Sequence, residues 1–214
     1  MPWSAGHKTR TRTRILDAAA DVLRRQGYFG VGLKALMRAA GLTPGAFYAH
    51  FPSKEALFAA VIGERHDFTN QLAKRRPARG ETDDGPSRGF EEAIDFYLSP
   101  DNLERVAAGC SLTTLSNDLP RSGPAVREAF DGHLHDLAAE MTRHLPKQPA
   151  DERAWRARAV LTLCVGGVTL ARGFGNERER DRWLAACRHA AYALAAPPDG
   201  PAAPAPAGGT ARKE

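Results

Sequence analysis

The spacing of apolar residues along the chain predicts helices rather than strands. Within residues 10–26 the apolar residues recur three or four positions apart, which is the spacing of one helix face: Ile15, Ala19, Val22 and Leu23. Gly27 follows and can end this helix, and residues 29–32 are expected to form a loop. No strand-like alternation of apolar and polar residues occurs in the sequence. The pattern therefore predicts an all-α protein.

Helical spacing of apolar residues returns in several later segments. A helix from Ser53 is expected to continue without a break to about Arg75. Residues 77–89 combine proline, glycine and charge and are expected to form a loop. Beyond it, helices are expected at 90–98, 101–107, 110–119, 124–145, 152–172 and 177–195. These elements divide the chain into a disordered arm (1–9), an N-terminal helical domain (10–54), a larger helical domain (55–196) and a Pro/Ala/Gly-rich disordered tail (197–214).

One short stretch, LKALMRAAGLTPGAFYAHFPSKEALF at residues 33–58, has the pattern of a helix-turn-helix. Its first apolar-periodic run ends at Gly41, because glycine can adopt the left-handed conformation that closes a helix. Thr43 can then cap a second short helix, and Pro44 suits the first helical position. In a helix-turn-helix the second helix enters the major groove of DNA with its N-terminal end.

The residue types around this second helix suit contact with DNA. Gly45 and Ala46 are small enough to let the backbone approach base edges, while Tyr48 and His50 can reach phosphates. Ser53 is expected to cap a third helix that starts with the cation Lys54. The candidate DNA-binding residues are Lys34, Thr43, Pro44, Gly45, Ala46, Tyr48, His50 and Lys54. The alternative is a surface helical hairpin whose aromatic residues fill a core: Phe47, Tyr48 and Phe51.

Residues 14–62, from RILDAAADVLRRQGY through the glycine turn to TPGAFYAHFPSKEALFAAVI, resemble the N-terminal domain of TetR-family transcriptional regulators. The resemblance implies an all-helical homodimer. A three-helix helix-turn-helix domain would bind double-stranded operator DNA, and a larger helical domain would bind a small-molecule effector and dimerise. The expected function is a sequence-specific regulator, a repressor that the effector releases from its operator.

Two positions depart from the family pattern. Gly32 stands where Ser or Thr usually caps the helix that begins at Leu33, so a side-chain cap is missing. Met37 stands where a small residue usually allows two helices to cross closely, and its flexible side chain can fit such a gap. We expect a modest change in packing and no loss of function.

Charge is distributed unevenly along the chain. Residues 1–76 contain 13 lysines and arginines against 5 acidic residues, whereas the remainder contains 17 against 20. A basic N-terminal part suits binding to phosphates. Four early cations could contact the DNA backbone or belong to a solvated basic tail: Lys8, Arg10, Arg12 and Arg14. No membrane-spanning run of roughly 18 apolar residues and no secretion signal is evident in the sequence, so we expect a cytoplasmic protein with no membrane partner.

The last two expected helices have the composition of an interface. Residues 152–172 contain the run VLTLCVGGVTLA, in which Gly166 and Gly167 would let another helix approach closely. Residues 177–195 carry one apolar stripe: Trp183, Cys187, Ala190, Ala191 and Leu194. An isologous homodimer through these helices would present two DNA-binding domains, and the family resemblance points to the same helices. The alternative is an ordinary monomer core.

Catalytic and metal chemistry find little support in the sequence. The histidines lack metal-ligand spacing, and no nucleophile-elbow motif occurs, so we expect no enzyme activity, metal or cofactor. An enzyme and a nonspecific DNA binder remain the rival classes. Cys110 follows Gly109 at an expected helix start, where the helix dipole would lower the thiol pKa. It could therefore sense electrophiles or oxidants, as some TetR-like regulators do, or simply be a small buried residue in a pocket.

The effector site is expected among the helices of the larger domain. Few of the candidate side chains are charged, which favours an apolar or aromatic ligand, although each is equally suited to a core. The candidate effector-binding residues are Phe68, Phe96, Tyr97, Cys110, Leu115, Phe130, Leu134 and Cys164.

Overall fold

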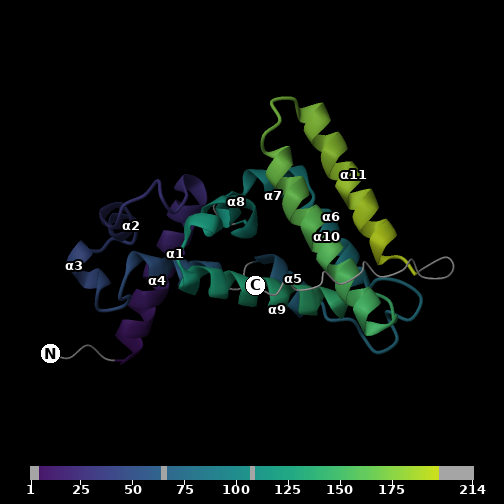
Figure 1. Cartoon of the computed structure of the whole chain (residues 1–214), viewed down its shortest axis with the longest axis horizontal. Coiled ribbons are helices and arrows are strands. Elements are labelled where there is room, and N and C mark those ends of the chain that lie inside the picture. Colours follow the sequence, from purple (N-terminus) through teal and green to yellow (C-terminus); the bar gives the residue numbers. More distant parts are fainter. Residues whose placement is uncertain (1–4, 64–66, 107–108, 198–214) are drawn as a thin grey trace, which may run out of the picture.

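A computed structural model describes residues 5–63, 67–106 and 109–197 of the 214-residue chain. Within these ranges the chain forms eleven α-helices and one 3₁₀ helix, with no strand. The predicted all-α class is confirmed. The first four helices gather at one end of the molecule, and the later helices form a larger body beside them (Figure 1).

The N-terminal domain consists of α1 (Ala5–Gln26), α2 (Leu33–Ala39), α3 (Pro44–Phe47) and the first part of α4 (Lys54–Gly63). Both predicted glycine turns are present, because Gly27 and Gly41 have φ angles of 73° and 64°. A compact apolar core joins the four helices, and its largest fully buried side chains are Ile15, Leu23, Leu36, Met37, Phe47, Leu57 and Phe58. Met37 is fully buried in this core, and its flexible side chain can adapt to the space between the helices.

The structure differs from the sequence prediction at two helix starts in this domain. Helix α1 begins at Ala5, so residues 5–9, which were expected to be a disordered arm, are helical. Residues 5–9 show no helical spacing of apolar residues, so the sequence pattern could not predict this part of the helix. Once the buried part of α1 has formed, extending the helix by a few residues costs little. Thr43 occupies the N-cap position of α3 with extended backbone, but its hydroxyl makes no capping hydrogen bond.

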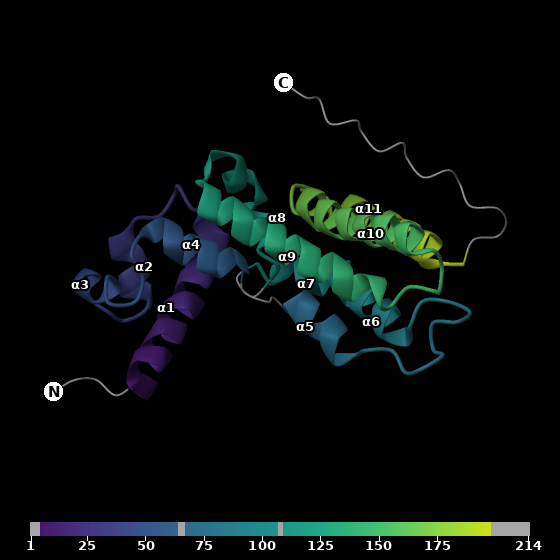
Figure 2. The ribbon, with the colours of Figure 1, turned by 60° about the horizontal axis from the view of Figure 1, so that its bottom comes forward.

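The body contains the remaining elements in chain order. These are α5 (Asp67–Lys74), α6 (Arg88–Tyr97), α7 (Pro100–Glu104), α8 (Leu112–Leu115), the 3₁₀ helix η1 (Ser116–Arg121), α9 (Pro124–Thr142), α10 (Ala150–Ala171) and α11 (Glu177–Ala195). Helix α9 begins beside α4 and runs across the body, and α10 and α11 pack side by side next to it (Figure 2). The body has its own core, whose fully buried members include Leu72, Phe90, Ile94, Leu98, Val160 and Cys164.

The three longest predicted body helices, at 124–145, 152–172 and 177–195, are confirmed as α9, α10 and α11. The predicted helix at 110–119 is wrong: α8 covers four residues and continues as η1. Hydroxyl groups here bond to nearby carbonyls, since Thr113 donates to Cys110 O and Ser116 donates to Leu112 O. Such local bonds compete with a regular α-helix.

Three other predictions fall partly outside the described residues. The expected continuous helix of residues 53–75 is seen as α4 and α5 on either side of residues 64–66, which are not described. The expected helix at 101–107 corresponds to α7, which ends at Glu104, and residues 107–108 are not described. The predicted disordered tail, apart from Pro197, also lies outside the described residues.

Helix α10 is the one described helix that is long and apolar enough to span a membrane by length and composition alone. In the fold it packs between α9 and α11, and Val160, Cys164 and Val168 are fully buried there. This burial is typical of the core helix of a folded body.

The segment from α8 to η1 connects the two parts of the molecule. The Arg24 guanidinium of α1 donates through Nε to Ser111 Oγ at 3.2 Å. The Tyr28 amide, just beyond α1, donates to Asp118 Oδ2 at 2.7 Å. Leu115 and Leu119 from the same segment join the N-terminal core. The body therefore holds the end of α1 through both apolar and polar contacts.

Candidate DNA-binding surface and ligand cavity

The N-terminal end of α3 is bare and open to solvent. Thr43, Pro44 and Gly45 are all exposed, and a side chain built on Gly45 would meet no protein atom within 4 Å. Phe47 and Phe51 point the other way and are buried, as the helical-hairpin alternative expected of them. Tyr48, in contrast, is 66% exposed and packs edge-on against Phe47. The backbone of α3 can therefore approach a partner closely, with Tyr48 beside it.

The first turns of α1 lie next to the end of this helix-turn-helix. The pKa of His50 is lowered, chiefly by burial and further by the cations Lys8 and Arg12. The Arg12 guanidinium also lies over the Phe51 ring, 4.8 Å from its centroid. Lys8 and Arg12, two of the four early cations, thus act on residues at the end of the helix-turn-helix. Because α1 is helical from Ala5, these cations are held in place and are not part of a loose tail.

Lys54 begins α4, as the sequence predicted, but its ammonium group is turned toward the protein. Its ammonium donates to the Tyr28 carbonyl oxygen at 2.5 Å and sits 4.1 Å from the centroid of the Tyr28 ring. Burial lowers the Lys54 pKa, although the nearby Asp118 carboxylate acts in the opposite direction. Lys54 therefore fastens the α1–α2 loop to α4 instead of reaching outward to a phosphate.

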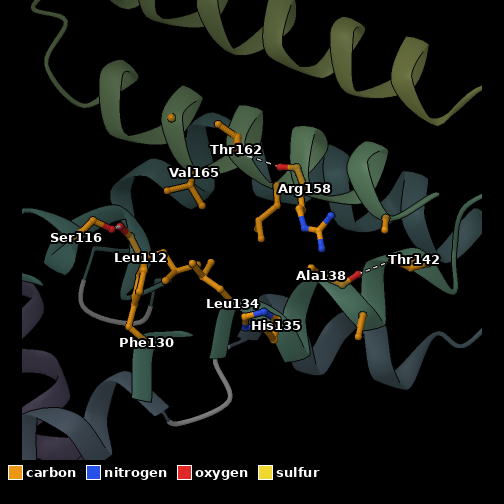
Figure 3. A pocket seen from close by; sticks show the side chains of 14 residues that line it. Leu112, Ser116, Phe130, Leu134, His135, Ala138, Thr142, Arg158, Thr162 and Val165 are labelled. Carbon is orange, nitrogen blue, oxygen red and sulfur yellow. Dashed lines mark hydrogen bonds between the residues drawn. The ribbon is translucent and has the colours of Figure 1, made fainter. Parts of the chain in front are cut away.

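The body contains a cavity of about 880 Å³ between α8, α9 and α10 (Figure 3). Its walls are mostly apolar, and the largest apolar side chains are Leu112, Phe130, Leu134, Leu161 and Val165. Polar groups enter it from Ser116, His135, Thr142, Arg158 and Thr162. This size and mixture of groups suit a small organic molecule.

Two of the eight predicted effector-binding residues, Phe130 and Leu134, line this cavity. The other six lie elsewhere. Four are buried in the body core: Phe68, Tyr97, Cys110 and Cys164. Leu115 belongs to the N-terminal core, and Phe96 is half-buried with the Arg105 guanidinium over its ring.

Sequence reasoning missed most of the cavity wall, including Leu112, His135 and Arg158. A signal was present, since residues 130, 134 and 138 of α9 share one helix face, as do residues 154, 158, 161 and 165 of α10. These two faces meet across the cavity.

Of the two alternatives for Cys110, a reactive thiol and a small buried residue, its surroundings fit the buried residue. The side chain is only 7% exposed, and burial raises the pKa of the thiol instead of lowering it. Helix α8 begins after Ser111 and has only four residues, so its dipole is small. Burial likewise raises the pKa of Cys164 and of Cys187. Among the described residues no group of three or more His, Cys, Asp or Glu side chains could hold a metal ion.

A helix-turn-helix on a helical body is the architecture of a class of DNA-binding proteins, and comparison with known proteins shows which of them this chain resembles. Residues 15–61 match the family described as bacterial regulatory proteins, tetR family. UidR from Escherichia coli K12, an HTH-type transcriptional regulator, is 41% identical over 71 residues, which cover 33% of this chain and 35% of UidR. The match thus spans about a third of the length of UidR.

Longer matches cover most of the chain. LmrA of Bacillus subtilis, also an HTH-type transcriptional regulator, is 26% identical over 165 residues, covering 75% of this chain and 86% of LmrA. Among solved structures, the reduced form of NemR from E. coli has a TM-score of 0.68 at 18% identity, covering 89% of this chain and 100% of NemR. A TetR regulator from Legionella pneumophila has the same TM-score at 20% identity, covering 83% and 93% of the two chains. Residues 15–61 therefore match the TetR-family model, and the chain as a whole has the fold of TetR-family regulators.

Proposed function

We propose that the chain is a dimeric, TetR-like transcriptional regulator that binds a short inverted repeat in operator DNA and is released by a small-molecule effector. The observation that carries this proposal is the exposed start of α3, with its small side chains, within a TetR-type helix-turn-helix. A regulator of this kind acts in the cytoplasm, where its operator is.

The proposed DNA contacts divide into two groups. Residues at the start of α3 would face base edges, because small side chains permit close approach: Thr43, Pro44, Gly45 and Ala46. Lys34 and Tyr48 are exposed beside them and, with His50, would bind phosphates. Lys8 and Arg12 join this second group because they lie beside His50. Lys54 leaves it because it is bound to Tyr28.

The outer faces of α10 and α11 support the proposed dimer. Leu170 and Trp183 are 59% and 47% exposed, although both are large apolar side chains. Gly167 does not serve this face: a side chain there would lie 2.9 Å from Cys187 Sγ, so this glycine permits the close crossing of α10 and α11 within one chain. Exposed apolar residues on adjacent helices favour burial against a second copy.

The cavity between α9 and α10 is the proposed effector site. The segment that connects it to the DNA-binding domain is short, because Leu112 and Ser116 line the cavity while Ser111 and Asp118 hold α1 and the Tyr28 amide. A ligand that displaces α8 would therefore alter the position of the N-terminal domain. Such coupling requires the ligand to bind two arrangements of the chain with different affinity.

Selection of binding sites from random DNA, followed by footprinting, tests this function. We expect one enriched near-palindrome that the protein protects as a single short stretch, with its two half-sites about one helical turn apart. Protection without any preferred sequence would instead indicate a nonspecific DNA binder. Absence of DNA binding together with substrate turnover would indicate an enzyme.

A further inference from the structure

One feature of the cavity is unusual for a site with apolar walls: an arginine points into it. The Arg158 side chain extends from α10 into the space between α9 and α10, on the side of Leu134 and His135 (Figure 3). It is accessible to solvent, so a ligand entering the cavity can reach it. No aspartate or glutamate is among the residues that line the cavity. The cavity therefore carries positive charge without an internal counter-ion.

Arg156, on the same helix, is an arginine with a clear structural role and can be compared with Arg158. Arg156 Nε lies 2.8 Å from Glu152 Oε1, and Arg156 Nη1 donates to the carbonyl oxygens of Leu194 and Ala196. These contacts explain why Arg156 is present, because they fasten the end of α11 to α10. Arg158 has no carboxylate partner within the described part of the chain, and its guanidinium does not link two helices as that of Arg156 does. Its five donor hydrogens are available to a ligand.

His135 offers a second polar group on the opposite wall. Its Nδ1 lies 2.7 Å from the Asp131 carbonyl oxygen, which can only accept a hydrogen bond. Nδ1 therefore carries hydrogen, and Nε2 is left for the cavity. In the neutral ring Nε2 can then accept a hydrogen bond from a ligand.

We propose that the cavity binds an amphipathic organic anion. Its aromatic or branched aliphatic body would lie against Leu112, Phe130, Leu134 and Val165, and its carboxylate or sulfonate would pair with Arg158. Arginine binds a planar carboxylate through two parallel hydrogen bonds, which fixes orientation as well as charge. This inference rests on the proposed function only in treating the cavity as the effector site.

Two dyes that differ by one anionic group provide the test. 1-Anilinonaphthalene-8-sulfonate carries a sulfonate, and N-phenyl-1-naphthylamine has the same rings without it. Fluorescence titration of the full chain should show that the sulfonate dye binds about tenfold more tightly, which corresponds to about 1.4 kcal/mol. The Arg158→Gln variant should lose this preference while its affinity for the neutral dye is unchanged. Arg158→Lys should keep part of it, and Arg178→Gln, which changes an exposed arginine on α11, should keep all of it.

A cavity-filling variant locates the dyes. Gly166 lines the cavity, and a β-carbon placed on it meets no protein atom within 4 Å, so we expect Gly166→Leu to fold and to occupy part of the cavity. Both dyes should bind this variant at least tenfold more weakly, and 2-naphthoate, but not 2-naphthamide, should displace the sulfonate dye from the unmodified chain. Equal affinity for the two dyes, or sulfonate binding unchanged in Arg158→Gln or in Gly166→Leu, would overturn the proposal. These titrations contain no DNA, so a failed operator selection would refute the regulator without affecting the anion site.

Discussion

At the scale of single residues, the body depends on a buried histidine that the sequence left without a role. His144 Nε2 lies 3.1 Å from the Leu72 carbonyl oxygen, so Nε2 carries hydrogen. In the neutral ring Nδ1 then accepts from the Ser87 hydroxyl, at 2.7 Å. Ser87 also caps α6, because its Oγ accepts from the Phe90 amide. One imidazole thus joins α5, the start of α6 and the end of α9.

This histidine predicts an acid-dependent loss of stability. Burial lowers the pKa of His144 below its ordinary value of 6.5, although the bond to Leu72 and the carboxylate of Glu140 oppose the shift. The unfolded chain therefore binds more protons than the folded chain between the lowered pKa and 6.5, and stability falls as pH decreases through this range. Urea denaturation at several pH values should show a shallower decrease below pH 6.5 for His144→Gln than for the unmodified chain. Parallel curves for the two proteins would contradict this role.

At the scale of elements, the α8–η1 segment predicts how firmly the N-terminal domain is held. Asp118→Ala removes the acceptor of the Tyr28 amide and should weaken this attachment by about 1–3 kcal/mol. Hydrogen exchange at the Tyr28 amide should then become faster. Arg121→Ala is the comparison variant: it removes the arginine that pairs with Asp118 at 3.2 Å from a largely exposed position, together with its contact over the Phe29 ring, and should have a smaller effect. Unchanged exchange in Asp118→Ala would show that apolar contacts alone hold the domain.

The basic start of α1 predicts which lysine contacts DNA. Lys8 is an exposed cation whose charge contributes to the lowered pKa of His50, whereas Lys54 is bound to Tyr28. Each lost phosphate contact lowers the salt slope of log affinity by about 0.9, and a dimer loses two contacts. Lys8→Ala should therefore lower the slope by about 1.8 in operator titrations at several salt concentrations. Lys54→Ala should leave the slope unchanged, and the reverse result would restore Lys54 as the phosphate contact.

A helix could be predicted well where apolar residues recurred at regular helical spacing over a long segment. This condition holds for α9, α10 and α11, whose bounds the sequence predicted to within a few residues. In 110–121 the hydroxyl and carboxylate side chains bond locally, and apolar spacing could not show that α8 would stop after four residues. The residues that line the cavity were harder to predict than the helices. Phe130 and Cys164 are both apolar residues on predicted helices, yet only Phe130 lines the cavity, while Cys164 is fully buried. Which side of a helix faces a neighbour depends on tertiary packing.

At the scale of the whole molecule, the proposed DNA-binding surface and the cavity lie in different parts of the fold. The basic N-terminal domain presents α3 at one end of the molecule (Figure 1). The cavity belongs to the body and is lined by Leu112 of α8 and by residues of α9 and α10. Helix α9 connects the two parts, since it packs on α4 at its start and on α10 farther along. A displacement at the cavity can therefore reach the DNA-binding domain by two routes, through α9 to α4 and through η1 to the Tyr28 amide.

The proposed dimer is the prediction that involves the whole molecule. Leu170→Arg combined with Trp183→Arg places charge on the exposed apolar face of α10 and α11 without touching the buried residues of either helix. A buried, unpaired arginine would oppose association, so sedimentation should show a monomer where the unmodified chain is a dimer. Operator affinity should fall with it, because one DNA-binding domain contacts a single half-site.

The control for this variant is Phe29→Ser, which removes another exposed apolar side chain from the α1–α2 loop, away from α10 and α11. It should sediment as the unmodified chain does. If the double arginine variant also remains a dimer and keeps its operator affinity, the chains associate through another surface, and Leu170 and Trp183 are exposed for a different reason. If the unmodified chain is a monomer both free and bound to DNA, the dimer itself is wrong, and the inverted-repeat operator expected from it is wrong as well.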